Sequence, residues 1–202
     1  MTSSAASNAL DSIIVSTDRD VRAKIAATLA AYLPPVHELC ANMNVHVQPL
    51  RAGQSYLQAS PALRRLQVDV DAWPVPAAGL FVVEERTAYL RVLSPMVIAH
   101  EYAHAIDCAL GGGVYLSTYD PAIRRAFSAA RGFVTPYSAC SLEEYWAESA
   151  RAAVSHRADV NDPGSPWPPA TRGRLQGIDP VMLRIVDGHL RQPNGLAAVP
   201  TP

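Results

Sequence analysis

Hydrophobic residues recur every three or four positions in several stretches of the chain. Val21, Ile25 and Leu29 follow this spacing, which predicts a helix over residues 18–33 with Thr17 or Asp18 as its cap. The two prolines at 34 and 35 end it. Similar patterns and capping residues predict further helices over residues 36–43, 120–130, 141–156 and 179–190.

Other stretches follow the two-residue period of strands. Residues 45–49 and 66–71 alternate between apolar and polar side chains, which predicts two strands, the second half-buried. Apolar and β-branched residues at 80–83 and 87–93, separated by the polar residues 84–86, predict a β-hairpin. This mixture of elements predicts an α+β fold.

One domain accounts for most of the chain. We expect a single domain over residues 18–192, between a flexible N-terminus at 1–17 and a flexible tail at 193–202. Within it, the proline-rich residues 161–170 are expected to be irregular. Nothing in the sequence predicts an oligomeric state.

Composition narrows the class of protein. The 202 residues are 49% hydrophobic and 17% charged, with a formal net charge of −1. This balance offers no basic surplus for nucleic acid, and no apolar run reaches the length of a membrane span. Three cysteines without framework spacing indicate a reducing compartment. Because no signal peptide is recognisable, we expect a cytoplasmic protein or one exported without a Sec signal.

The most informative helix is predicted over residues 95–110. Ser94 is a favoured cap, Pro95 a favoured first helical residue, and Gly111 a natural left-handed end. The helix contains the motif H-E-x-x-H, in which His100 and His104 lie one turn apart on the same face. Two such imidazoles can hold one Zn²⁺. The alternative is a pair of core histidines beside a surface glutamate.

The position of a third ligand decides the class of zinc site. Leu110 stands six residues after His104, where the metzincins carry a ligand, so that class is excluded. Asp107 and Cys108 lie too far along the helix axis to complete a tetrahedron with the two histidines. For Asp107 we expect a supporting hydrogen bond near a ligand or a buried salt bridge, and for Cys108 simple packing.

The predicted helix over 141–156 offers other carboxylates. Glu144 and Glu148 are four residues apart on one face, which suits one carboxylate on zinc and another that orients a ligating histidine. Ser141 and Glu144 also form S-x-x-E, a capping box, which is an alternative role for Glu144. Arg151 is either exposed or paired with a carboxylate of the site.

Two blocks of the sequence resemble one known family. HEYAHAID and YSACSLEEYWAESARA look like the zinc endopeptidase domain of anthrax lethal factor and its relatives, which include the secreted Pro-Pro endopeptidases. In that family, H-E-x-x-H-x-x-D is followed by a tyrosine and, seven residues later, by a glutamate in E-[FY]-[FW]-A-E. Tyr137 and residues 144–148 match this pattern.

The resemblance implies a zincin-like catalytic domain, in which a small mixed sheet packs on the H-E-x-x-H helix and on a second, glutamate-bearing helix. It implies zinc on His100, His104 and Glu144. It further implies Glu101 as general base, Tyr137 as the phenol that faces the scissile carbonyl, and Glu148 as a supporting residue behind the ligands.

We therefore expect a zinc-dependent endopeptidase that acts on a protein or peptide substrate. An extended peptide would add to the free edge of the hairpin at 80–93. Two alternatives stay open. One is a zinc-binding protein without peptidase activity, and the other is a delivered toxin or effector protease that cuts a single host protein.

Overall fold

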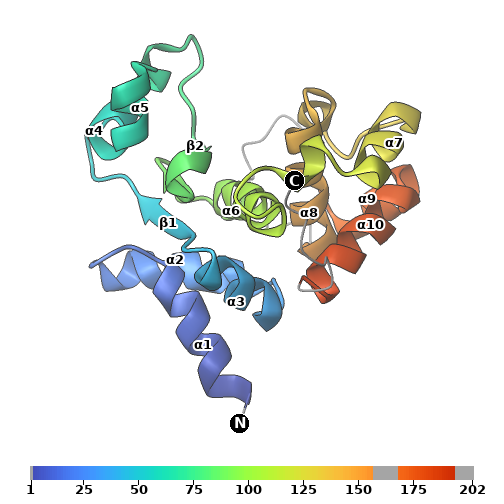
Figure 1. The fold of residues 1–202 in the computed structure, drawn as a ribbon, viewed down its shortest axis with the longest axis horizontal. Helices are drawn as coiled ribbons and strands as arrows, with labels where there is room; N and C mark the ends of the chain where they lie inside the picture. Colours follow the sequence, from blue (N-terminus) through green and yellow to red (C-terminus); the bar gives the residue numbers. More distant parts are fainter. Residues whose placement is uncertain (1, 157–167, 194–202) are drawn as a thin grey trace, which may run out of the picture.

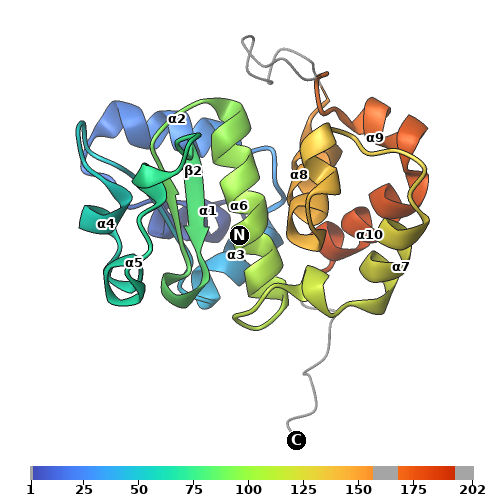
Figure 2. The same cartoon turned by 90° about the horizontal axis from the view of Figure 1, so that it is seen from above.

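The computed structural model describes residues 2–156 and 168–193. A small sheet and its helices form one half of the molecule, and a group of helices forms the other (Figures 1 and 2). Helix α6 (Pro95–Leu110) runs between the halves, with α8 (Leu142–Val154) beside it. The fold is α+β, as the sequence predicts.

The sheet has three strands, β1 (His46–Pro49), β2 (Gly79–Val82) and β3 (Thr87–Leu90). Their order is β1-β3-β2, with β1 parallel and β2 antiparallel to β3, so Val47 and Phe81 both lie opposite Ala88. The predicted hairpin is confirmed. Because β3 is central, the free edge of the hairpin belongs to β2, on the side facing α6 (Figure 2).

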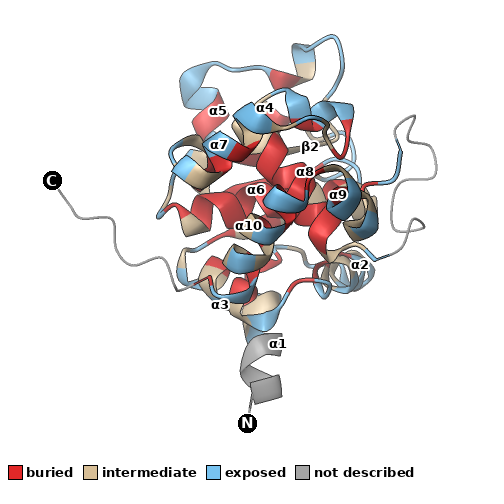
Figure 3. Cartoon of the chain, turned by 90° about the vertical axis from the view of Figure 1, so that its right-hand side faces the viewer, coloured by how far each residue is buried: buried red, intermediate tan, exposed pale blue. Residues whose placement is uncertain are grey.

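Helix α6 is buried along most of its length, as Figure 3 shows. Its start is as predicted: Ser94 Oγ accepts a hydrogen bond from Val97 N at 3.3 Å, and Pro95 is the first helical residue. Its end differs. Gly111 has φ −83°, whereas Gly112 has φ +71°, so the left-handed turn falls one residue later than expected.

Three helices come before β1 in the described chain, namely α1 (Thr2–Ile13), α2 (Arg19–Leu29) and α3 (Pro34–Asn42). The last two correspond to predicted helices, and Asp18 caps α2. The predicted end of α2 at residue 33 is wrong, because the helix ends at Leu29 and Pro34 begins α3 instead of ending α2. Helix α1 was not predicted, because its first residues are small and polar. Its end is nevertheless in the core, since Ile13 and Ile14 are buried and Val15 N donates to Val47 O at 2.9 Å.

The strand predicted at 66–71 is wrong. The chain there completes α5 (Pro61–Leu66), which follows α4 (Tyr56–Ala59), and then forms the 3-10 turn η1 (Val70–Ala72). Gln67 is left-handed, and the Asp69 carboxylate accepts from Asp71 N at 3.0 Å, a local bond that replaces strand pairing. The alternation of apolar and polar residues indicated a strand with one buried face, but the apolar residues Leu66 and Val68 are 53% and 38% exposed.

The 3-10 turn η2 (Val83–Glu85) connects the two strands of the hairpin. The second half of the molecule contains α8 and the helices α7 (Pro121–Ala129), α9 (Arg172–Ile178) and α10 (Pro180–Arg191). It also contains two 3-10 turns, η3 (Leu116–Thr118) and η4 (Pro136–Ala139). Asp120, Ser141 and Asp179 cap α7, α8 and α10 as expected. Helix α9 was not predicted.

Residues 161–167 of the expected irregular segment and 194–202 of the tail lie outside the described residues. No helix among those described is both long and apolar enough to cross a membrane.

Candidate metal centre

The packing of α6 against α8 creates the site. Trp146 is fully buried between the helices, and its indole Nε1 donates to Ala103 O at 3.1 Å, which fixes one helix against the other. With this alignment, His100 and His104 on α6 face Glu144 on α8. These are the three residues that the family resemblance implies as zinc ligands.

Three ligand atoms converge on one point. His100 Nε2 lies 3.2 Å from His104 Nε2 and 3.2 Å from Glu144 Oε2, and His104 Nε2 lies 3.4 Å from Glu144 Oε2. A tetrahedral ion with metal–ligand distances of about 2.0–2.1 Å separates its ligands by about 3.3 Å. The three atoms thus already have the spacing of one face of a zinc tetrahedron.

The chemistry of these atoms also fits a cation. Glu144 Oε2 is buried, and it has no hydrogen-bond partner among the described residues, although two ring nitrogens lie within 3.4 Å of it. A buried carboxylate oxygen without a donor is costly unless a cation neutralises it. Two imidazoles and one carboxylate leave a fourth position open, which is the ligand set of catalytic rather than structural zinc sites.

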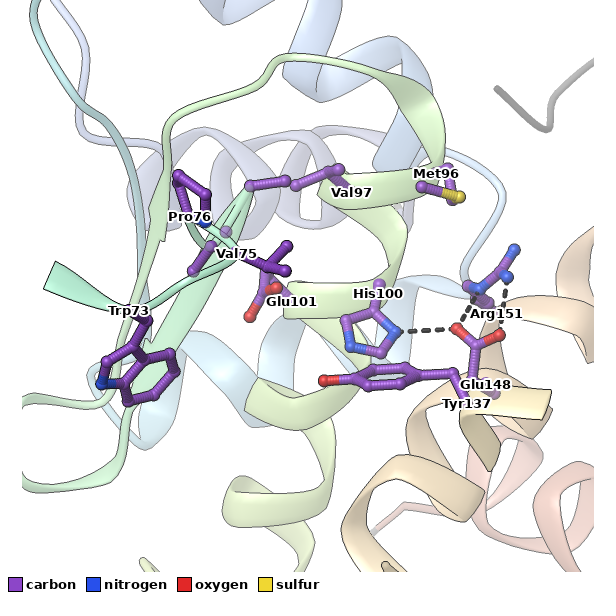
Figure 4. A pocket seen from close by; sticks show the side chains of 13 residues that line it. Trp73, Val75, Pro76, Met96, Val97, His100, Glu101, Tyr137, Glu148 and Arg151 are labelled. Carbon is purple, nitrogen blue, oxygen red and sulfur yellow. Dashed lines mark hydrogen bonds and ion pairs between the residues drawn. The ribbon is translucent and has the colours of Figure 1, made fainter. Parts of the chain in front are cut away.

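Glu148 holds His100 from behind. Its Oε1 accepts a hydrogen bond from His100 Nδ1 at 2.9 Å, which leaves Nε2 free to point at the other ligands (Figure 4). Arg151 forms two bonds to the same carboxylate, from Nε to Oε1 at 2.6 Å and from an Nη to Oε2 at 2.7 Å. Arg151 is therefore a buried partner of the site and not an exposed side chain.

These carboxylates set the protonation of the site. Burial lowers the pKa of His100, but the neighbouring carboxylates of Glu144 and Glu148 together raise it more strongly, to about 10. Burial raises the pKa of Glu144, while His100 and His104 bring it down to about 2. Glu144 is consequently ionised at neutral pH, as a ligand must be.

The Glu101 side chain is closely packed against the edge strand β2. It is buried, and the backbone of Phe81 on β2 lies close enough to lower the pKa of its carboxylate. Burial raises the pKa of Glu101, and the nearby histidines oppose that rise. A Cβ at Gly79 would lie 2.5 Å from Glu101 Cγ, so only glycine leaves room for this side chain. The sequence gives no signal for this role of Gly79.

Tyr137 lies across the site from Glu101 (Figure 4). It belongs to the turn η4, its ring centre is 5.7 Å from that of His100, and its hydroxyl donates to Glu144 Oε1 at 3.0 Å. Burial and the Glu144 carboxylate raise its pKa, so the phenol keeps its proton at neutral pH. It can therefore serve as a hydrogen-bond donor.

Two further expectations concern Asp107 and the capping box. Asp107 is fully buried, but it accepts from Ser117 N at 2.9 Å and from Ser117 Oγ at 2.5 Å. Within the described chain, no hydrogen bond joins Asp107 to His100 or His104, so it supports η3 directly. Ser141 Oγ accepts from Glu144 N at 3.2 Å, so Glu144 takes part in the cap through its backbone while its carboxylate faces the histidines.

A pocket of about 450 Å³ opens over these groups. Figure 4 shows Glu101 and the Tyr137 hydroxyl pointing into it. The opposite wall is apolar and comes mainly from the segment that precedes β2 and from the start of α6, namely Trp73, Val75, Pro76, Met96 and Val97. The site thus combines a metal-binding face, a buried carboxylate, a phenol and an apolar wall.

Comparisons with known proteins support the fold. No family model matches the sequence, and no curated protein matches it. Among solved structures, a Pro-Pro endopeptidase from Paenibacillus alvei matches with a TM-score of 0.63 and 17% sequence identity, over 89% of this chain and 98% of that one. The chain therefore has the zincin-like fold of a Pro-Pro endopeptidase, the group of proteins that its two sequence blocks resemble.

Proposed function

We propose that the protein is a zinc-dependent endopeptidase. The observation that carries this proposal is the convergence of His100 Nε2, His104 Nε2 and Glu144 Oε2 within 3.4 Å of one another, beside a pocket that also receives Glu101 and Tyr137. A metal site without peptidase activity would not need the last two groups, whose placement suits peptide hydrolysis.

The ligands would be His100, His104 and Glu144, and zinc held there would polarise a peptide carbonyl and make water a stronger nucleophile. Glu101 acts as general base: its carboxylate takes a proton from the attacking water and delivers it to the leaving amine. Burial raises the pKa of this carboxylate, which makes Glu101 a stronger base toward water than an exposed glutamate.

Tyr137 stabilises the transition state. Its protonated hydroxyl stands beside the metal ligands and would donate a hydrogen bond to the oxyanion that develops on the carbonyl oxygen. To do so it exchanges its bond to Glu144 for one to substrate. Removing one such donor typically lowers the rate by about 10²- to 10³-fold.

The substrate would bind as an extended peptide along the outer edge of β2. This strand is the free edge of the hairpin, and it passes Glu101 at Gly79. The apolar wall favours an apolar side chain close to the scissile bond. Because the matching Paenibacillus enzyme is a Pro-Pro endopeptidase, peptides that contain Pro-Pro are the first candidates.

The test is cleavage of an unbiased peptide library by the zinc-loaded protein, read by mass spectrometry. We expect internal cleavage at a defined sequence. Glu101→Gln should abolish cleavage while it retains bound zinc, since it removes the base and no ligand. Glu143→Gln is the matched control, because it removes a carboxylate at the start of the same helix as Glu144 and should leave activity unchanged. Zinc binding without any cleavage would refute the proposed function.

A further inference from the structure

We propose that Thr135 is a positioning residue that couples Tyr137 to the metal ligand His100 through Glu148. The inference rests on the proposed function, since it assigns Thr135 a part in peptide hydrolysis. It is carried by a continuous chain of hydrogen bonds between buried groups, which links the turn that bears Tyr137 to the back of the metal centre.

Glu148 is the centre of this chain. It is 2% exposed, and its two oxygens serve different partners. Oε1 accepts from His100 Nδ1 at 2.9 Å, whereas Oε2 accepts from Thr135 Oγ1 at 2.6 Å. Arg151 bridges both oxygens and keeps the carboxylate plane fixed. The carboxylate that orients the zinc ligand is therefore also the acceptor that holds Thr135.

Thr135 in turn fixes the turn η4. It is the N-cap of that turn, and its Oγ1 accepts from Ser138 N at 3.3 Å while Ser138 Oγ accepts from Thr135 N at 3.3 Å. A threonine hydroxyl has a single proton, and the ionised Glu148 can only accept. That proton consequently goes to Glu148, and Ser138 Oγ must be the donor in its 3.1 Å contact with Thr135 Oγ1.

Tyr137 depends on this turn for its position. It stands between Pro136 and Ser138, and 38% of its surface is exposed, so the core does not enclose its ring. A four-residue 3-10 turn has few backbone hydrogen bonds of its own, and Pro136 has no N–H to add. The Thr135–Glu148 bond therefore ties the turn that bears the phenol to the carboxylate that orients His100.

The experiment compares Thr135→Val, which removes the hydroxyl at nearly constant shape, with Thr135→Ser, which keeps it. In the zinc-loaded protein we expect Thr135→Val to lower kcat by about tenfold to a hundredfold, the range for one hydrogen bond to a charged group. KM should be nearly unchanged, and Thr135→Ser should restore most of kcat. Thr171→Val is the control, because it removes the capping hydroxyl of α9 away from the site and should leave kcat unchanged.

A double-mutant cycle separates positioning from general destabilisation. In the Tyr137→Phe background the phenol is already absent, so Thr135→Val should cost less than about threefold in kcat. An equal loss in both backgrounds would overturn the proposal, because Thr135 would then not act through Tyr137.

Crystal structures give a readout that does not depend on activity. In zinc-loaded Thr135→Val the Tyr137 ring should be displaced or adopt alternate positions, whereas in Thr135→Ser it should stay in place. An unmoved Tyr137 in Thr135→Val would overturn the inference, whatever the activity. A protein that binds zinc but cleaves no peptide would instead overturn the proposed function, and the crystal structures would still decide the role of Thr135.

Discussion

Replacing Gly79 with alanine should disable the general base without disturbing the metal ligands. Gly79 lies at the start of β2 and is not among the glycines with positive φ, so alanine can adopt its backbone conformation. The difficulty is the added methyl group. Its carbon would lie 2.5 Å from Glu101 Cγ and 2.7 Å from Oε1, whereas ordinary contacts of a Cβ begin at 3.4 Å.

The size of the effect follows from that overlap. Glu101 Cγ must withdraw by about 0.9 Å, and because Cγ is close to the backbone, the side chain cannot avoid the methyl group by rotating its end alone. A displacement of about 1 Å at a reacting group can cost about a hundredfold in rate. We therefore expect kcat/KM to fall by about a hundredfold, with a stability loss of about 1–3 kcal/mol from overpacking.

The assay is steady-state cleavage of the best library peptide, together with zinc affinity from chelator competition. Zinc affinity should change by less than about threefold, because His100 and His104 are not touched. Gly188→Ala is the matched control: that position lies in α10 with nothing within 4 Å of an added Cβ, and alanine should stabilise it by about 0.5–1 kcal/mol. Wild-type kcat/KM in Gly79→Ala would refute the placement of Glu101 as base.

Two further predictions concern the metal centre. Glu148→Gln should weaken zinc binding by about 10- to 100-fold, because it removes the charge that orients His100. Chelator competition measures this affinity, and an unchanged value would contradict the role of Glu148. Because the pKa of His100 is raised to about 10, protons compete with zinc at neutral pH, so the apparent zinc affinity should rise by about tenfold per pH unit from pH 7 to 9. An affinity independent of pH over that range, measured in a non-coordinating buffer, would show that His100 does not hold a competing proton there and would contradict its raised pKa.

Local patterns in the sequence were sufficient for the central elements. Helix α6 has a Ser-Pro start, apolar residues along its length and a glycine-rich end, so its bounds could be predicted from the sequence. The spacing between Tyr137, Glu144 and Glu148 identified the second helix of the site through the family resemblance. In each case the decisive information lies within a short stretch of chain.

Elements whose structure depends on distant contacts were missed. Residues 66–71 alternate like a strand, but no strand in the described part of the chain pairs with them, and the Asp69 side chain accepts from Asp71 N instead. Helix α1 begins with small polar residues, and its contribution to the core is visible only at its end, in Ile13 and the following Ile14. Single-sequence periodicity contains no information about such partners.

Some residues around the site could not be assigned from the sequence for the same reason, although the support of His100 by Glu148 was expected. Asp107 has the sequence position expected of a residue that supports a zinc ligand, but Ser117 occupies its carboxylate. Arg151 looks like an ordinary helical arginine until α8 packs against α6 and buries it beside Glu148. The need for glycine at position 79 arises because the Glu101 side chain, which comes from α6, packs directly against it.

The most direct test of the metal centre is a crystal structure of the zinc-loaded protein with anomalous data collected on both sides of the zinc absorption edge. The account predicts one anomalous peak, at about 2.0–2.2 Å from His100 Nε2, His104 Nε2 and an oxygen of Glu144. No peak at this position, or a peak bound by other residues, would contradict it.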